Sequence, residues 1–276
     1  MKQSLMTLMI AMAASHATAA TWSDTFIGYR YGTNHAEPAI PHDITKHIVQ
    51  FNHVSGYSLG SNLLNVDLLI SDDKDPAAGG KEGAQEIYLL YRHQMSMGKL
   101  SGQDMSWGPV KDLAITGGFD ANTKNTAFAP KKRMLVIGPT LKFDVPQGFW
   151  DMSVFYRDER NHNGLSFAKQ NKIHFKRTWQ FDTAWGIPFD AGGVPMRFKG
   201  FLNYIPAKGR DGFLAETKPE TYLNAALMAD IGSLIAERKD AVYAGLGYRY
   251  WHNKFGNAPG VGTRERGVSL QLEWHL

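Results

Sequence analysis

The last nine residues of the chain alternate strictly between apolar and polar side chains. Apolar residues occupy positions 268, 270, 272, 274 and 276, and polar residues fill the positions between them. Successive side chains of a β-strand point to opposite faces, so this pattern predicts a strand with one apolar and one polar face. A chain built from such strands needs a second apolar surface, or a lipid surface, to cover the apolar face.

The same alternation recurs along the chain. It is clear near 64–70, 86–92, 135–143, 150–157, 196–204, 223–231 and 242–250, and weaker at 22–33, 44–54, 111–120 and 172–185. Together with 268–276 these segments predict about twelve strands, each of about 9–13 residues. Such lengths exceed the ~5–6 residues of a soluble strand and suit a tilted membrane strand of ~9–11 residues.

The first twenty residues predict a secretory signal peptide. Lys2 is followed by an apolar stretch over 5–14, and Ala17-Thr18-Ala19 is a small-x-small cleavage site, so we expect 1–20 to be removed. The remaining part, 21–276, contains no apolar run of about 18 residues and therefore no predicted spanning helix. In lipid only helices and closed sheets satisfy all backbone hydrogen bonds.

These observations favour an all-β fold with one domain over 21–276, a transmembrane antiparallel β-barrel of about 12 strands. A soluble periplasmic β-sandwich is the alternative fold. The predicted connections alternate in length, which is typical of barrels with short periplasmic turns and long extracellular loops. Short connections are expected at 55–60, 144–148, 186–193 and 232–239, and long ones at 34–42, 71–85, 121–131, 158–171, 206–218 and 253–263. The exception is 94–110, which is long on the turn side.

Composition excludes several classes of function. The chain has no Cys, which excludes disulfides, thiolate catalysis and Cys-ligated metals. The 30 Lys and Arg residues barely exceed the 26 Asp and Glu residues, so nucleic-acid binding has little support. The ten His form no H-E-x-x-H motif, and we expect neither a metal nor a cofactor. The acidic segment 72–75 lacks the ligand order of a calcium loop and is expected to be solvated.

The polar face of the predicted strands is the candidate functional surface. In a barrel it lines the lumen, where we expect side chains that contact a solute: Arg30, Tyr88, Arg92, Phe155, Arg157, Arg197, Lys199 and Arg249. Acidic and amide side chains share this face, namely Asp67, Glu86, Asp151, Asn203, Asn224 and Asp230, with Phe201 and Tyr243 among them. Opposed charges would create a transverse field that orients dipolar solutes, and aromatic faces would stack on planar rings.

The apolar face is expected to meet outer-membrane lipid through Leu64, Val66, Ile87, Leu135, Val154, Leu227, Leu270 and Leu272. Aromatic residues near the strand ends suit the interfacial girdles of a barrel: Trp22, Tyr31, Trp150, Trp185, Tyr204, Tyr250, Trp251 and Trp274. The final strand, 268–276, resembles the C-terminal strand by which the barrel-assembly machinery recognises outer-membrane proteins. Leu276 stands where Phe is more usual.

Two motifs allow catalytic alternatives. Gly56-Tyr57-Ser58-Leu59-Gly60 matches the G-x-S-x-G nucleophile elbow, but a strand follows where that motif requires a helix, so a hairpin turn is expected. His53-Val54-Ser55 resembles the His-x-Ser signature of outer-membrane phospholipase A, in which the imidazole takes the hydroxyl proton. The family's following Asn is absent here. We expect no enzyme, and keep a lipid hydrolase using His53 and Ser55 as an alternative.

The chain resembles the Tsx-type nucleoside-specific channels of the bacterial outer membrane. The segment 99–112, KLSGQDMSWGPVKD, is similar to the family's K-L-x-x-x-D-L-S-[FW]-G-P-x-K-[DE] stretch, and 248–252, YRYWH, to its A-R-Y-W-H. A further similarity covers GFWDMSVFY at 148–156. The resemblance implies a monomeric twelve-stranded barrel that passes nucleosides passively, with Arg249 as the best-matched lumen position.

The function expected from the sequence is therefore a passive outer-membrane channel for nucleosides or similar planar polar solutes. A plugged barrel that acts through its loops as a surface receptor or adhesin is the remaining alternative.

Overall fold

The computed structural model describes residues 20–235 and 238–276. All but the last residue of the predicted signal peptide lies outside this part of the chain. Among the described residues, no helix is both long and apolar enough to cross a membrane. Twelve long strands run over β1 (Trp22–His35), β2 (Ile44–Tyr57), β3 (Gly60–Ser71), β4 (Gln85–Ser96), β5 (Val110–Lys124), β6 (Arg133–Phe143), β7 (Phe149–His162), β9 (Thr178–Ala191), β10 (Val194–Ile205), β11 (Glu220–Asp230), β12 (Val242–His252) and β13 (Arg264–His275).

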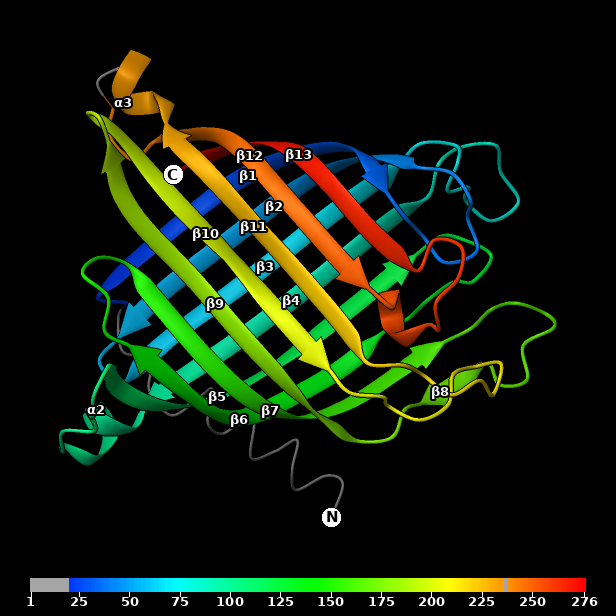
Figure 1. The fold of residues 1–276 in the computed structure, drawn as a ribbon, viewed down its shortest axis with the longest axis horizontal. Coiled ribbons are helices and arrows are strands. Elements are labelled where there is room, and N and C mark those ends of the chain that lie inside the picture. The colour runs from blue at the N-terminus through cyan, green and yellow to red at the C-terminus, as the bar shows by residue number, and fades with distance from the viewer. Residues whose placement is uncertain (1–19, 236–237) are drawn as a thin grey trace.

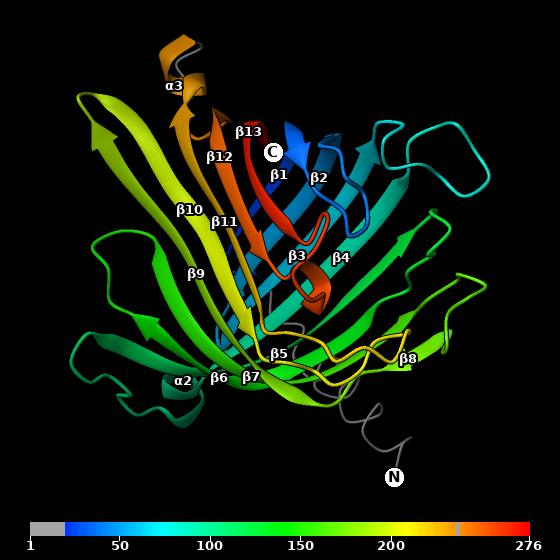
Figure 2. The ribbon, with the colours of Figure 1, turned by 45° about the vertical axis from the view of Figure 1, so that its right-hand side comes forward.

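The long strands close into one barrel (Figures 1 and 2). Each long strand pairs antiparallel with its neighbour along the chain, β1 pairs with β13, and β6 pairs with β7 to complete the ring. The short strand β8 (Lys172–His174) pairs only with the last three residues of β7. The predicted twelve-stranded antiparallel barrel is confirmed, and the sandwich alternative is wrong because a single sheet closes on itself.

Some strand boundaries differ from those predicted. The weak segment at 172–185 divides into β8 and β9, and β9 continues to Ala191. The predicted connection at 186–193 is therefore mostly strand, with a two-residue turn at Gly192 and Gly193. Both glycines have positive φ, 67° and 89°, a conformation that other residues adopt at a cost.

The connections alternate in length as expected, except at 97–109, where the sequence also predicts a long connection, and at 231–241, which is as long as 253–263. At one end lie the short turns 58–59, 144–148 and 192–193, the segment 97–109 with α2 (Met97–Ser101), and the segment from α3 (Ile231–Ile235) to β12. At the other end lie 36–43, 72–84, 125–132, 163–177, 206–219 and 253–263, the last with the 3₁₀ turn η1 (Lys254–Gly256). The G-x-S-x-G segment is the hairpin turn between β2 and β3, as expected. We call the two ends the short-turn end and the long-loop end.

The two faces of the sheet have opposite character. All eight predicted wall residues lie on the outer face, where Leu270 is 61% exposed and Leu227 46% exposed. The inner face holds buried charged and amide side chains, among them Asp120, Arg157 and Glu265. A soluble protein would bury its apolar face, so this inverted arrangement is that of a membrane-spanning β-barrel.

The predicted aromatic girdle is only partly correct. Trp22 and Trp251 have the parity of the inner face, since Trp22 is four residues before Phe26 and Trp251 two residues after Arg249. Adjacent residues of a strand point to opposite sides, so Tyr250 and Trp251 could not both face lipid.

Candidate functional site: the polar lumen

The strand register directs all eight predicted site residues into the lumen. Their side chains do not form one site. Tyr88 and Arg92 lie on β4, and Phe155 and Arg157 lie on β7, with β5 and β6 between these two strands. Arg30 and Arg249 lie near the closure of β1 with β13, and Arg197 and Lys199 lie on β10. A solute-binding role for these residues stays a prediction.

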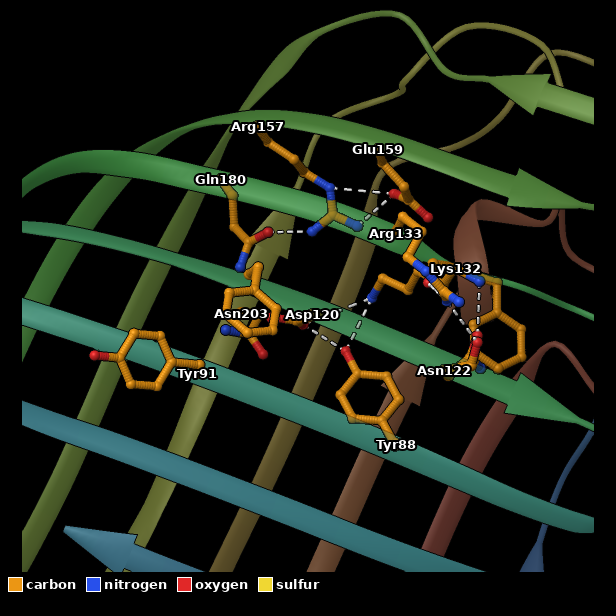
Figure 3. A network of polar contacts seen from close by, with 12 residues as sticks. Tyr88, Tyr91, Asp120, Asn122, Lys132, Arg133, Arg157, Glu159, Gln180 and Asn203 are labelled. Atoms are coloured by element: carbon orange, nitrogen blue, oxygen red, sulfur yellow. Dashed lines mark hydrogen bonds and ion pairs between the residues drawn. The ribbon is translucent and has the colours of Figure 1, made fainter. Parts of the chain in front are cut away.

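One group of lumen contacts centres on Asp120 of β5 (Figure 3). Arg92 Nη1 donates to one carboxylate oxygen at 2.6 Å, and the Tyr88 hydroxyl donates to the other at 2.5 Å. Lys132, from loop 125–132, reaches inward and donates to the Tyr88 hydroxyl at 3.0 Å. Two predicted site residues, Tyr88 and Arg92, are therefore held by a carboxylate that the sequence reasoning did not single out.

Beside this group, Glu159 of β7 binds two cations, Arg157, which is labelled in Figure 3, and Lys208. Arg157 Nη2 lies 2.5 Å from the carboxylate, and Lys208, from loop 206–219, lies 2.8 Å from it. Arg157 also donates to the side chain of Gln180 on β9. Since Lys208 is only 4% exposed, the loop that carries it folds into the barrel end rather than away from it.

A second group, which we call the mouth network, lies at the long-loop end. Glu37, in loop 36–43, contacts the ammonium groups of Lys46 at 2.6 Å, Lys254 at 3.4 Å and Lys124 at 3.5 Å. Asp75, in loop 72–84, contacts Lys124 at 2.7 Å and Lys46 at 3.6 Å. Two loops are thereby fastened to strands β2 and β5 across the mouth of the barrel. Asp75 is 2% exposed, so the expectation of a solvated acidic loop is wrong at this position.

The charge of Glu37 is stabilised by its surroundings. Burial by itself raises the pKa of the Glu37 carboxyl, but Lys254, Lys46 and Lys124 outweigh burial and hold this pKa well below its usual range. A depressed pKa contributes stability above the usual carboxyl value of about 4.3, and this stability is lost only as the pH falls toward the lower folded-state value. The fastening of loop 36–43 should therefore be the same at pH 5 and pH 7.

Arg249 belongs to the same mouth network. Its Nη1 atom lies 3.1 Å from the carboxylate of Glu265 and 2.8 Å from Nδ1 of His35. Lys254 binds the other oxygen of Glu265 at 2.7 Å. Glu265 is 2% exposed and neutralises two cations, yet the sequence reasoning missed it because the predicted last strand began at 268, four residues too late.

The cations nearer the short-turn end are more accessible. Lys199 pairs with Glu273, Lys142 lies 3.1 Å from Asp151, and Arg197 lies over the Tyr243 ring, 4.4 Å from its centroid. Side-chain exposures of 23–24% for these three cations contrast with 3% for Lys46 and Lys254 in the mouth network. The lumen is therefore most tightly packed beneath the long loops.

The charges of the lumen are interleaved around the wall. Each cation lies beside a carboxylate, as in the pairs Arg30–Asp67, Arg92–Asp120, Lys142–Asp151, Lys199–Glu273 and Arg249–Glu265. Fields of adjacent opposite charges cancel at distances larger than their separation. This pairing contradicts the transverse field that the sequence suggested, because strand alternation cannot tell which charges become neighbours.

An aromatic row on the inner face was also missed. Phe201 of β10 meets Tyr222 of β11 edge-on at 5.2 Å between ring centroids, and Tyr222 stacks on Trp251 of β12 at 4.1 Å with an interplanar angle of 16°. All three rings are partly exposed. Only Phe201 was expected to face the lumen, while Trp251 was placed in the girdle. Trp251 lies two residues after Arg249 in the same strand, so strand alternation places its side chain on the lumen face with that of Arg249.

The hydrolase alternative receives no support from the geometry. His53 and Ser55 lie on the outer face of β2 near the short-turn end. Nδ1 of His53 is 2.7 Å from the hydroxyl of Thr25 on β1, so the imidazole is paired across strands rather than with Ser55. A base that binds Thr25 is not placed to activate Ser55.

Comparisons with known proteins show only distant likeness. No protein-family model and no curated protein matches the chain. Among solved structures, the translocator domain of the autotransporter NalP from Neisseria meningitidis is 12% identical, with a TM-score of 0.47, over 100% of this chain and 95% of that one. The KdgM porin is 9% identical, TM-score 0.43, over 90% and 98%. The NanC porin is 9% identical, TM-score 0.45, over 92% and 100%.

Similarities of this size carry no argument about function. They also leave the resemblance to Tsx-type channels untested, and it stays a prediction. The function of the barrel has to be inferred from its own lumen.

Proposed function

We propose that the protein is a passive channel of the bacterial outer membrane that passes small polar solutes, with the long loops outside the cell. The observation that carries the proposal is the lumen: hydrogen-bonding and charged side chains line it from the mouth network to the short-turn end, inside a wall that is apolar toward lipid. Such a lining replaces the hydration of a polar solute. Transport down a gradient requires no covalent chemistry and no cofactor.

For the solute, we propose nucleosides or similar planar polar molecules. The row formed by Phe201, Tyr222 and Trp251 offers stacking faces, and the amides of Asn203 and Asn224 extend from the same inner face of β10 and β11. Stacking of a base on an aromatic side chain contributes about 1–3 kcal/mol. Amide groups beside the rings can bond the edge of a base or the hydroxyls of a sugar.

The direct test is the conductance of the refolded barrel in a planar bilayer, titrated with adenosine, thymidine and a hexose as control. Block by sub-millimolar nucleoside but not by the sugar supports both the channel and the choice of nucleosides as its solute. A conducting pore that is indifferent to nucleosides supports the channel and contradicts the choice of solute. A barrel that does not conduct contradicts the channel.

Replacing Tyr222 with leucine should weaken nucleoside block about tenfold, because the middle ring of the aromatic row is lost. Tyr248→Leu, on the outer face of the adjacent strand, is the matched control and should leave block unchanged. The half-blocking concentration for adenosine measures both variants. Equal block by wild type and Tyr222→Leu would remove the row from the solute pathway.

The mouth network favours one alternative, a plugged barrel that acts through its loops as a receptor or adhesin. If Glu37 fastens loop 36–43 across the mouth, Glu37→Gln should loosen the loop and increase the single-channel conductance. Hydrogen exchange of the loop amides should rise in parallel. Glu82→Gln, an exposed substitution in loop 72–84, is the control. A non-conducting wild type together with a conducting Glu37→Gln variant would favour the plugged barrel.

A further inference from the structure

Exposed basic side chains gather on the outer face of the barrel at the long-loop end. We call Arg133, Arg160, Lys172, His174 and Arg177 the basic rim patch. Arg133 begins β6, and Arg160 lies near the end of β7. Lys172 and His174 belong to β8, which pairs with the last three residues of β7 (Figure 1). The strand parity of Leu135 and Tyr156, both exposed on the apolar wall, directs Arg133 and Arg160 outward.

The pairing register places basic side chains opposite one another in this patch. Arg133 faces Arg160 across β6 and β7, and Arg160 faces His174 across β7 and β8. Like charges directly opposite in a sheet are destabilising. Arg133 donates to the backbone carbonyls of Asn122 and Lys132, at 3.1 and 2.6 Å. Within 20–235 and 238–276, no carboxylate forms an ion pair with Arg133 or Arg160.

Among the residues that the structure describes, the one carboxylate that pairs with the patch is already occupied. Asp158 accepts from Arg177 Nε at 3.0 Å and lies 3.0 Å from Nε2 of His174. Four permanent cations, Arg133, Arg160, Lys172 and Arg177, therefore share a single negative charge. On the inner face, by contrast, Arg157 of β7 and Asp120 of the neighbouring strand β5 each have a direct partner of opposite charge. The basic rim patch therefore carries an excess of positive charge, whereas the lumen cations are paired with carboxylates.

Aromatic side chains locate the patch relative to the membrane. Tyr156 and Trp179 are register partners on the outer face, 51% and 48% exposed, and Trp179 contacts Tyr204 at 5.6 Å between ring centroids. Such rings mark the membrane interface of a barrel. Arg160 lies four residues beyond Tyr156, about 13 Å along the strand. The patch is thus at the depth of the lipid headgroups, above the apolar band.

We propose that the basic rim patch binds the phosphate groups of a phosphorylated glycolipid of lipid A type in the outer leaflet. Guanidinium groups match phosphate oxygens bidentately, and a phosphate between Arg133 and Arg160 relieves their repulsion. Each interfacial cation strengthens binding of an anionic lipid about fivefold. The inference rests on the proposed placement of the long loops outside the cell, but not on conduction.

The test uses the full barrel refolded in detergent, with lipid A binding followed by native mass spectrometry. The patch variant is Arg133→Gln/Arg160→Gln/Lys172→Gln. The control, Lys99→Gln/Lys111→Gln/Lys239→Gln, makes the same charge change with exposed lysines at the short-turn end. The patch variant should bind lipid A about 100-fold more weakly than wild type, and the control should bind like wild type. Without lipid, the patch variant should keep or exceed the wild-type melting temperature, because the repulsion is relieved.

Dephosphorylated lipid A and phosphatidylglycerol are the comparison lipids, and both should bind more weakly than lipid A. The proposal is overturned if the patch variant binds lipid A as wild type does, if both triple variants lose affinity equally, or if either comparison lipid binds as tightly. Conductance of the patch variant, measured separately, should be unchanged. Failure of lipid binding is therefore distinguishable from failure of the channel proposal.

Discussion

Replacing Glu265 with alanine is expected to lower the free energy of unfolding by about 3–5 kcal/mol. The Glu265 side chain is 1% exposed and neutralises both Arg249 and Lys254 at 3.1 and 2.7 Å. Its removal takes the nearest carboxylate from buried Arg249 and leaves Lys254 with the more distant Glu37, at 3.4 Å. Buried charges that lose a partner are costly. Urea titration of the barrel in lipid vesicles, followed by Trp fluorescence, measures the effect.

Glu216→Ala is the matched control for this substitution. Glu216 also forms an ion pair, with Arg210 at 2.8 Å, but its side chain is 63% exposed. Exposed pairs contribute about 0–1 kcal/mol, so this variant should unfold like wild type. If Glu265→Ala and Glu216→Ala lose equal stability, the mouth network does not stabilise the barrel. Glu265→Gln separates the loss of the charge from the loss of the side chain's volume, since glutamine keeps the shape and removes only the charge.

The second large effect is expected on the outer wall. Leu270→Arg should destabilise the barrel by about 2–4 kcal/mol, the cost of a guanidinium near the bilayer midplane. Leu270 lies midway along β13 and is 61% exposed on the outer face. The chain already carries Arg264 and Arg266 on that face of the same strand, nearer the long-loop end. Depth in the bilayer, rather than outward orientation alone, sets the cost.

Thr221→Arg is the control for the wall. Thr221 begins the outer face of β11 at the long-loop end, where an arginine costs about 0–1 kcal/mol. The same urea titration compares the two variants. A Leu270→Arg barrel as stable as Thr221→Arg would mean that β13 does not face the hydrocarbon core. Both arginines tolerated in detergent but only Thr221→Arg in lipid is the expected result.

Most of the barrel was predictable because strand alternation is a local property. Successive residues of 242–250 and of 268–276 alternate in polarity whichever strands lie beside them. The alternation therefore assigns Leu270 to the wall and Arg249 to the lumen correctly. Errors arose where the alternation weakens or stops. The segment 172–185 includes the short strand β8, part of a loop, and the beginning of the long strand β9. Trp251 was expected in the girdle because it is aromatic, although its position in the strand places it on the lumen face.

The polar contacts of the lumen were not predictable for a different reason. The sequence shows that Arg92 and Asp120 are both polar, but their 2.6 Å contact depends on the register between β4 and β5. Glu37 and Asp75 lie in loops, which have no periodicity to indicate that they turn inward. The resemblance to nucleoside channels singled out Arg249 and gave no indication of its partner Glu265.

The sequence by itself determined the alternating segments, their two faces and which connections are long, because each depends on residues close together in the chain. Only the tertiary structure decided which charges became partners, that loops close over the mouth, and that Arg133 faces Arg160 with no carboxylate partner in the described part of the chain. These depend on strand register and on loop paths, which join residues as far apart as Glu37 and Lys254. Pairing at that range follows from closure of the barrel, which no local pattern encodes.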